Sequence, residues 1–146
     1  MALAERTAQV QWTGTLADGS GTVKAGSGAV SDLALDWASD SASADGTTSP
    51  EELLAASHAG CYAMALALLL ARQGNRAERL DVGAKCALEE RGDWYAITAI
   101  DLDVTGTVPG LDGAAFEQAA READEHCPIS IALRDQVEIR VKATLA

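Results

Sequence analysis

The fold of this chain is decided by one stretch, Ser49-Pro-Glu-Glu-Leu-Leu-Ala-Ala-Ser-His-Ala-Gly-Cys-Tyr-Ala-Met-Ala-Leu-Ala-Leu-Leu-Leu-Ala71, which continues to Gly74. Ser49 is a favoured N-cap residue, and Pro50 suits the first helical position, where its missing N–H would have no partner. Glu51 follows in the first turn, where the helix dipole favours negative charge. Gly74 supplies a C-cap. These start and stop signals predict one helix over about residues 50 to 73.

The predicted helix has no charged residue between Leu53 and Ala71, so it is apolar nearly all the way round. Such a helix is either buried in a protein or spans a bilayer. Its many small residues, together with Ser57 and His58, favour a buried central helix over a membrane span. The other elements of the chain are too few to cover it. We therefore predict an obligate homodimer in which the central helices bury one another between two sheets.

Composition narrows the class of protein. The chain has 146 residues, which fits a single domain over 1–146. Its net charge of −11 argues against binding to nucleic acid or to anionic membranes. The N-terminus has no apolar signal-peptide core, which predicts a cytoplasmic protein. No zinc-ligand spacing or phosphate-binding glycine motif is found, so no metal or cofactor is predicted.

Alternating patterns and turn residues predict the remaining elements. The fold class indicated by their order is α+β. Strands are expected over 7–13, 22–24 and 33–37, followed by an exposed, mobile loop over 38–49. A long antiparallel hairpin is expected over 80–90 and 94–108, then a helix over 113–125, a short helix at 128–133 and a final strand over 136–145.

Three cysteines in a cytoplasmic chain do not form a disulfide scaffold, so any pairing would be catalytic or redox-sensing. Cys127 precedes Pro128, which places the cysteine at a helix N-cap. Free N–H groups there stabilise a thiolate, although a plain capping role is the alternative. Cys86 lies on the apolar face of a predicted strand and reads as core. Cys61, inside the apolar helix, reads as inert core unless another group activates it. His58, three residues earlier on the same face, is one candidate, and a structural histidine is the alternative.

Two motifs carry a resemblance to a known family. Residues Thr48 to Leu68 resemble the central-helix motif of the OsmC/Ohr family of thiol peroxidases, and His126-Cys-Pro-Ile-Ser130 resembles its second cysteine motif. Trp12-x-Gly14, Gly21-Thr-Val23 and Val108-Pro-Gly110 also fit, so the resemblance covers nearly the whole chain in the right order. It implies an intertwined α+β homodimer with antiparallel sheets wrapped around long central helices.

The resemblance also implies a reaction. Cys61 matches the peroxidatic cysteine, Cys127 the resolving cysteine, and Glu51 the glutamate that holds an activating arginine. The Cys61 thiolate would reduce an organic hydroperoxide, and hydrogen peroxide less well, to become a sulfenic acid. Cys127 would then condense with it to a disulfide. An external dithiol, such as a lipoylated protein, would reset the enzyme without metal or flavin.

The sequence departs from the family at the activating arginine. Neither residues 37–45 nor residues 16–22, the two places where relatives carry it, contain an arginine or lysine. A buried thiol without a nearby cation has a raised pKa and low nucleophilicity. The cations that would have to replace the arginine are Lys24, Arg72, Arg76 and Arg79.

Two other functions remain open at this point. The missing arginine favours a non-peroxidase member of the same fold, a dimeric binding or redox-sensing protein whose cysteines form a disulfide without rapid turnover. A Cys–His acyl-transfer enzyme built on Cys61 and His58 is a third reading, with no orienting third group evident.

Overall fold

A computed structural model describes residues 1–37 and 46–146. The chain forms two compact units, Met1–Pro50 and Glu51–Ala146, which are described in turn. Most of the loop predicted over 38–49 lies outside the described residues. The prediction of a single domain over the whole chain stays a prediction.

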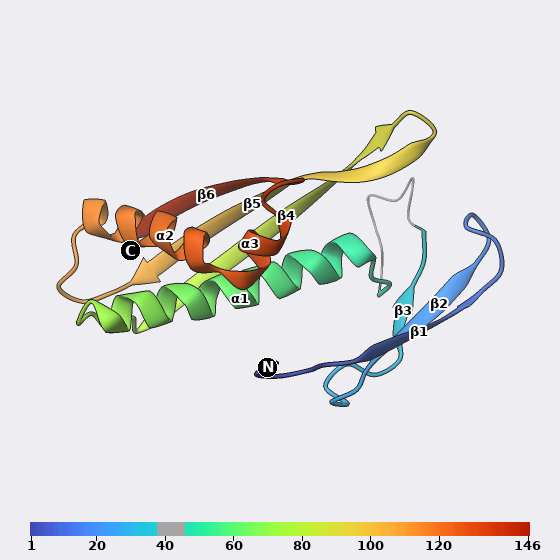
Figure 1. The fold of residues 1–146 in the computed structure, drawn as a ribbon, viewed down its shortest axis with the longest axis horizontal. Coiled ribbons are helices and arrows are strands. Elements are labelled where there is room, and N and C mark those ends of the chain that lie inside the picture. The colour runs from blue at the N-terminus through green and yellow to red at the C-terminus, as the bar shows by residue number, and fades with distance from the viewer. Residues whose placement is uncertain (38–45) are drawn as a thin grey trace. The chain divides into compact units, whose positions relative to one another are not determined.

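The first unit is a small antiparallel sheet (Figure 1). Its strands are β1 (Ala8–Thr13), β2 (Ser20–Ala25) and β3 (Leu33–Leu35), in the order β1-β2-β3. Gly21 pairs with Trp12 across the first two strands. A Cβ at Gly21 would lie 2.8 Å from the carbonyl oxygen of Gln11 and 3.0 Å from the Trp12 ring, so the close pairing requires glycine. The strand pattern predicted for this region is confirmed.

The second unit holds a three-stranded sheet and three helices (Figure 1). In chain order they are α1 (Pro50–Arg72), β4 (Arg79–Arg91), β5 (Trp94–Thr107), α2 (Gly113–His126), α3 (Pro128–Leu133) and β6 (Glu138–Leu145). The N-cap of α2 agrees with the sequence, since the Asp112 side chain accepts a 2.8 Å hydrogen bond from the N–H of Ala115. The mixed α+β fold is the one that the sequence predicts.

One strand runs in the direction opposite to expectation. β4 and β5 form the predicted antiparallel hairpin, but β6 pairs with β5 in parallel. The prediction of antiparallel sheets is therefore wrong for β6. The physical reason is the connection: the chain passes through α2 and α3 after β5, and a crossover through helices returns a strand in the same direction.

One face of α1 belongs to the core of this unit. Tyr62, Leu66 and Leu70 repeat every four residues and are fully buried. They join a cluster with the central strand β5 and the inner face of α2, whose buried members include Ile100, Leu102, Val104, Phe116, Ala119, Ala120 and Ala123. The Tyr62 hydroxyl donates a 2.8 Å hydrogen bond to the carbonyl oxygen of Ala120, which links α1 to α2.

The other face of α1 stays exposed in the single chain. Met64 and Leu68 are 70% and 53% exposed. The helix is long and apolar enough to cross a membrane, and 22% of its most apolar window is buried. A core helix passes the same test of length and composition, and the buried face of α1 is part of the core of the unit. The exposed face agrees with the sequence-based expectation that the elements of a single chain are too few to cover this helix.

Candidate functional site

The site is built where α1 meets the start of α3. Cys61 lies midway along α1 and is half-buried, whereas Cys127 is fully buried at the junction between α2 and α3. The backbone N–H of Cys127 donates to the carbonyl oxygen of Ala123, which closes α2, and Pro128 then opens α3. The Cys61 thiol lies within hydrogen-bonding reach of Cys127, and all three cysteines are free thiols. The structure therefore brings together the two cysteines that the sequence singles out.

The environment of Cys61 shifts its acidity in opposing directions. Burial raises the pKa of the Cys61 thiol above its ordinary value, and the neighbouring Cys127 raises it further. The backbone N–H of Ile129 bonds to the Cys61 sulfur and works to lower that pKa. The sequence argument assigned the free N–H groups of α3 to Cys127. Cys127 is the N-cap, as predicted, but its side chain makes no capping bond, and Cys61 receives an N–H instead.

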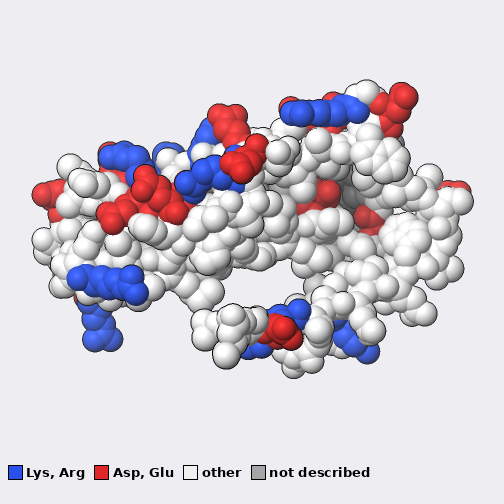
Figure 2. Space-filling model, viewed as in Figure 1, with Lys and Arg blue, Asp and Glu red and all other residues white. Residues whose placement is uncertain are grey.

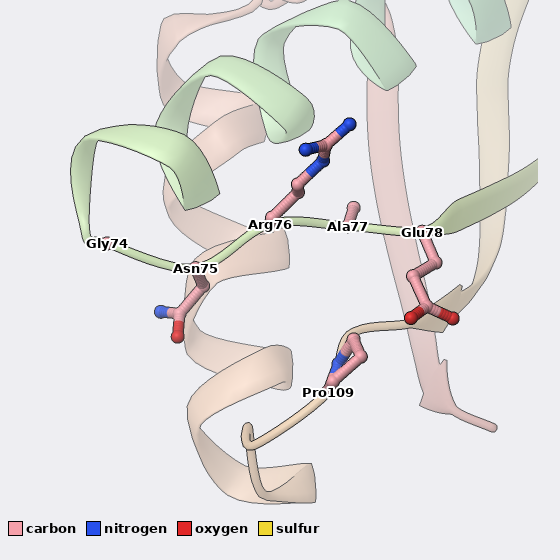
Figure 3. A pocket seen from close by; sticks show the side chains of 6 residues that line it. All are labelled: Gly74, Asn75, Arg76, Ala77, Glu78 and Pro109. Atoms are coloured by element: carbon pink, nitrogen blue, oxygen red, sulfur yellow. The ribbon is translucent and has the colours of Figure 1, made fainter.

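The expected cations are not seen to activate Cys61. Among the described residues, no lysine or arginine is one of the groups that shift its pKa. Arg79 is paired with Asp81 at 2.8 Å, and both side chains are exposed. Arg76 lies in the loop after α1, where its side chain points to one side and those of Asn75 and Glu78 to the other (Figure 3). Lys24 belongs to β2 in the first unit. Arg72 shares a hollow with Cys61.

Glu51 lies apart from the cysteine pair. It stands in the first turn of α1, ten residues before Cys61, which corresponds to about 15 Å along a helix. Its charge acts on Cys86 instead, whose pKa is raised first by burial and then by Glu51. Cys86 packs against the core, in line with its predicted structural role.

A hollow of about 340 Å³ opens beside Cys61. It is lined by Cys61, Met64, Ala65, Leu68, Leu69, Arg72, His126 and Pro128. The size is that of a small-molecule site, and most of the wall is aliphatic. The arrangement suits an apolar molecule whose reactive group reaches the Cys61 sulfur.

A buried hydrogen bond lies next to the cysteines and was missed by sequence reasoning. His58 Nε2 and Ser130 Oγ are 2.7 Å apart, and both residues are fully buried. Burial lowers the pKa of His58 and the charge of Asp124 opposes this, so the imidazole is neutral at neutral pH. His58 is more buried than the structural histidine we expected. Because its Nε2 is bonded to Ser130 rather than to Cys61, the structure does not support a Cys–His acyl-transfer pair.

The sequence held one signal for Ser130. It follows Cys127 by three positions, which places both on the same face of a helical turn. A metal centre finds no support within 1–37 and 46–146, where no group of three or more His, Cys, Asp or Glu side chains is placed to hold an ion.

The fold and the facing thiols define an α+β protein with a dithiol site, and comparison with known proteins gives the family. Residues 43–142 match the family described as OsmC-like protein. The chain is 33% identical over 131 residues to peroxiredoxin OsmC of Escherichia coli (strain K12). The alignment covers 90% of this chain and 91% of that protein. The chain belongs to the OsmC family, which confirms the resemblance seen in the sequence.

Solved structures agree on the fold. An organic hydroperoxide resistance protein OsmC from Legionella pneumophila aligns with a TM-score of 0.80 and 24% identity, over 99% of both chains. The organic hydroperoxide resistance protein OhrB of Bacillus subtilis aligns with a TM-score of 0.76 and 24% identity, over 94% of this chain and 98% of its own.

Proposed function

We propose that this protein is a thiol peroxidase that reduces organic hydroperoxides, and hydrogen peroxide less well. One observation carries the proposal: the Cys61 and Cys127 thiols face each other beside an apolar hollow. Two thiols in contact form a disulfide with no large rearrangement, and the hollow offers room for the organic part of a peroxide. The names of the relatives, peroxiredoxin and organic hydroperoxide resistance protein, support the same chemistry.

The reaction proceeds in three steps: oxidation of Cys61, formation of the disulfide and its reduction. The Cys61 thiolate attacks one peroxide oxygen, the O–O bond breaks, and the alkoxide takes a proton and leaves as the alcohol. Cys61 is then a sulfenic acid. The Cys127 sulfur attacks the Cys61 sulfur, a disulfide forms, and the hydroxyl leaves as water. An external dithiol returns two electrons and two protons by thiol–disulfide exchange, becoming a disulfide itself. The Ile129 N–H stabilises the attacking thiolate.

The proposal includes a homodimer. In Figure 2 the surface over the middle of α1 and over α3 carries few charged side chains, whereas charged side chains lie toward the ends of α1 and along the edge above it. Met64 and Leu68 of α1 are exposed and also line the hollow beside Cys61. A second copy that covers α1 would bury this face and close the open side of the hollow. The cytoplasmic location and the nature of the dithiol stay predictions from the sequence.

Single-turnover kinetics test the assignment. The reduced protein is mixed with cumene hydroperoxide, and peroxide loss is followed with and without dihydrolipoamide. We expect Cys61→Ser to abolish consumption and Cys127→Ser to consume one equivalent and stop at a sulfenic acid that dimedone traps. Cys86→Ser is the matched control, since this thiol lies outside the pair, and it should turn over like wild type. Equal turnover in wild type and Cys61→Ser would rule out the assigned role of Cys61.

A second candidate function is a redox-sensing or binding protein with the same fold. The observation that favours it is the raised pKa of Cys61, which no lysine or arginine among the described residues lowers. Oxidation by peroxide that is slow at neutral pH and accelerates only at alkaline pH, with no sustained turnover, would support sensing over catalysis.

A further inference from the structure

The His58–Ser130 hydrogen bond runs beside the cysteine pair and joins the same two segments. His58 precedes Cys61 by three residues on α1, and Ser130 follows Cys127 by three residues on α3. One turn of helix thus separates the bond from the thiols on each side. The 2.7 Å bond connects residues 72 positions apart in the sequence, both of them fully buried.

Among the described residues, the anchors of α3 include the His58–Ser130 bond, the bond from the Ile129 N–H to the Cys61 sulfur and, at the C-cap, the bond from Arg134 to the carbonyl oxygen of Asp124. α3 is a helix of six residues, and Ser130 is its buried member. Ile129 and Leu133 pack against the core but remain partly exposed, and Ile131 is 58% exposed. A helix this short has little stability of its own, so its position depends on the contacts that it makes. The His58–Ser130 bond joins two fully buried side chains and is therefore one of the contacts that fix α3 over Cys61.

We propose that the His58–Ser130 hydrogen bond is a latch that positions Cys127 opposite Cys61 and so favours closure of the disulfide. His58 and Ser130 are positioning residues, since their hydrogen bond joins them to each other and not to a reacting sulfur. The place of this step in a catalytic cycle rests on the proposed function. The pairing of the two thiols does not, because it can be measured without peroxide.

The physical argument is one of effective concentration. A disulfide requires the sulfurs to approach to about 2.05 Å, whereas hydrogen-bonded thiols are farther apart. With α3 fixed, rotation of the two side chains closes this gap. Without the latch, α3 samples positions in which the sulfurs do not meet, which lowers the effective concentration of one thiol at the other. Loss of one ordinary hydrogen bond corresponds to a change of about tenfold in an equilibrium constant.

The test measures the Cys61–Cys127 disulfide directly. Variants in a Cys86→Ser background are equilibrated with mixtures of reduced and oxidised dithiothreitol, quenched by acid and alkylation, and quantified by mass spectrometry. In this exchange the protein loses two electrons and two protons, and oxidised dithiothreitol gains them. Ser130→Ala and His58→Leu each remove the latch and should lower the disulfide equilibrium constant about tenfold. The double variant should be no worse than either, because both changes delete one interaction.

Two matched variants separate positioning from general loss of stability. His58→Gln keeps a polar group near the place of Nε2 and should restore most of the equilibrium constant. Tyr62→Phe removes a different buried hydrogen bond of α1, the one to Ala120 in α2, and should leave the disulfide equilibrium within about twofold of wild type. Urea unfolding of every reduced variant confirms that each is folded before the exchange is measured.

A kinetic measurement shows which step of the proposed cycle depends on the His58–Ser130 bond. After one equivalent of cumene hydroperoxide, Ser130→Ala should form the sulfenic acid at the wild-type rate and the disulfide about tenfold more slowly. A disulfide equilibrium unchanged in Ser130→Ala, or lowered equally by Tyr62→Phe, would overturn the latch. If peroxide fails to oxidise wild-type Cys61, the peroxidase proposal fails, while the dithiothreitol equilibrium still decides the latch.

Discussion

Substitution of Leu68 by lysine tests the proposed homodimer most directly. Leu68 is 53% exposed and Met64 70% exposed in the single chain, so both have apolar surface left for a partner to cover. Full burial of a leucine or methionine side chain is worth about 1.5–3 kcal/mol. Covering the exposed part of each side chain is then worth about 1–2 kcal/mol, and a two-fold interface counts every residue twice.

From this reasoning, Leu68→Lys removes about 2–4 kcal/mol from dimerisation, and an ammonium group placed in an apolar contact adds to the loss. The dissociation constant should rise by a factor between about 30 and 1,000. Sedimentation velocity over a range of protein concentrations measures this shift. Gln118→Lys is the matched control, because it adds the same charge at an exposed position of α2. It should leave the dissociation constant within about threefold of wild type.

Two results would refute this reasoning. One is a wild-type protein that sediments as a monomer at about 10 µM, a concentration far above the dissociation constant of an obligate dimer. The other is Leu68→Lys that dimerises as tightly as Gln118→Lys, since the exposed face of α1 would then not be the contact surface. Leu68 also lines the hollow beside Cys61, so peroxidase activity is not used as the readout.

Further predictions concern the core and the two titrating groups of the site. Gly106→Ala places a Cβ against the Phe116 ring and should cost about 1–3 kcal/mol in urea unfolding, whereas Gly83→Ala, with no heavy atom within 4 Å of the new Cβ, should cost less than about 0.5 kcal/mol. Burial holds the pKa of His58 below its ordinary value of 6.5, so the unfolded chain is protonated first as the pH falls. The contribution of neutral His58 to the free energy of unfolding is fully present above pH 6.5 and is lost as the pH falls through the folded pKa. His58→Gln should therefore flatten that part of the profile of urea midpoint against pH, and an unchanged profile would contradict this assignment. Burial raises the pKa of Cys61 above 9.0, so its alkylation by iodoacetamide should still accelerate through pH 9, and a plateau near neutral pH would reveal an activating cation.

The structure limits which cation could replace the missing arginine near Cys61. Sequence reasoning proposed four replacements for the missing arginine, and of the three that belong to Glu51–Ala146 the structure places Arg72 on the hollow that contains Cys61. Arg72 follows Cys61 by eleven positions of one helix, about 16 Å along the axis, so its charge is not at the sulfur. Arg79 is engaged with Asp81.

The sequence by itself determined the local elements. Start and stop signals predicted α1 to within a residue or two, because the N-cap residue, the first-turn carboxylates and the glycine stop act within one helical turn. The same holds for α2, where the predicted Asp112 cap is observed. Two cysteine motifs in order were enough to indicate the family, since they record chemistry in contiguous residues.

The tertiary structure alone decided the contacts of the site. It gave the Ile129 N–H to Cys61 instead of Cys127 and joined His58 to Ser130 across 72 positions of sequence, and it set Cys61 against Cys127, a pairing that the sequence implied only through the family resemblance. It also turned β6 parallel to β5. Periodicity reports which face of an element is apolar but carries no information about which distant element covers that face, or in which register. The acidity of Cys61 and the partner of His58 follow from that packing, because burial and hydrogen bonds act over a few ångströms in space regardless of separation along the chain.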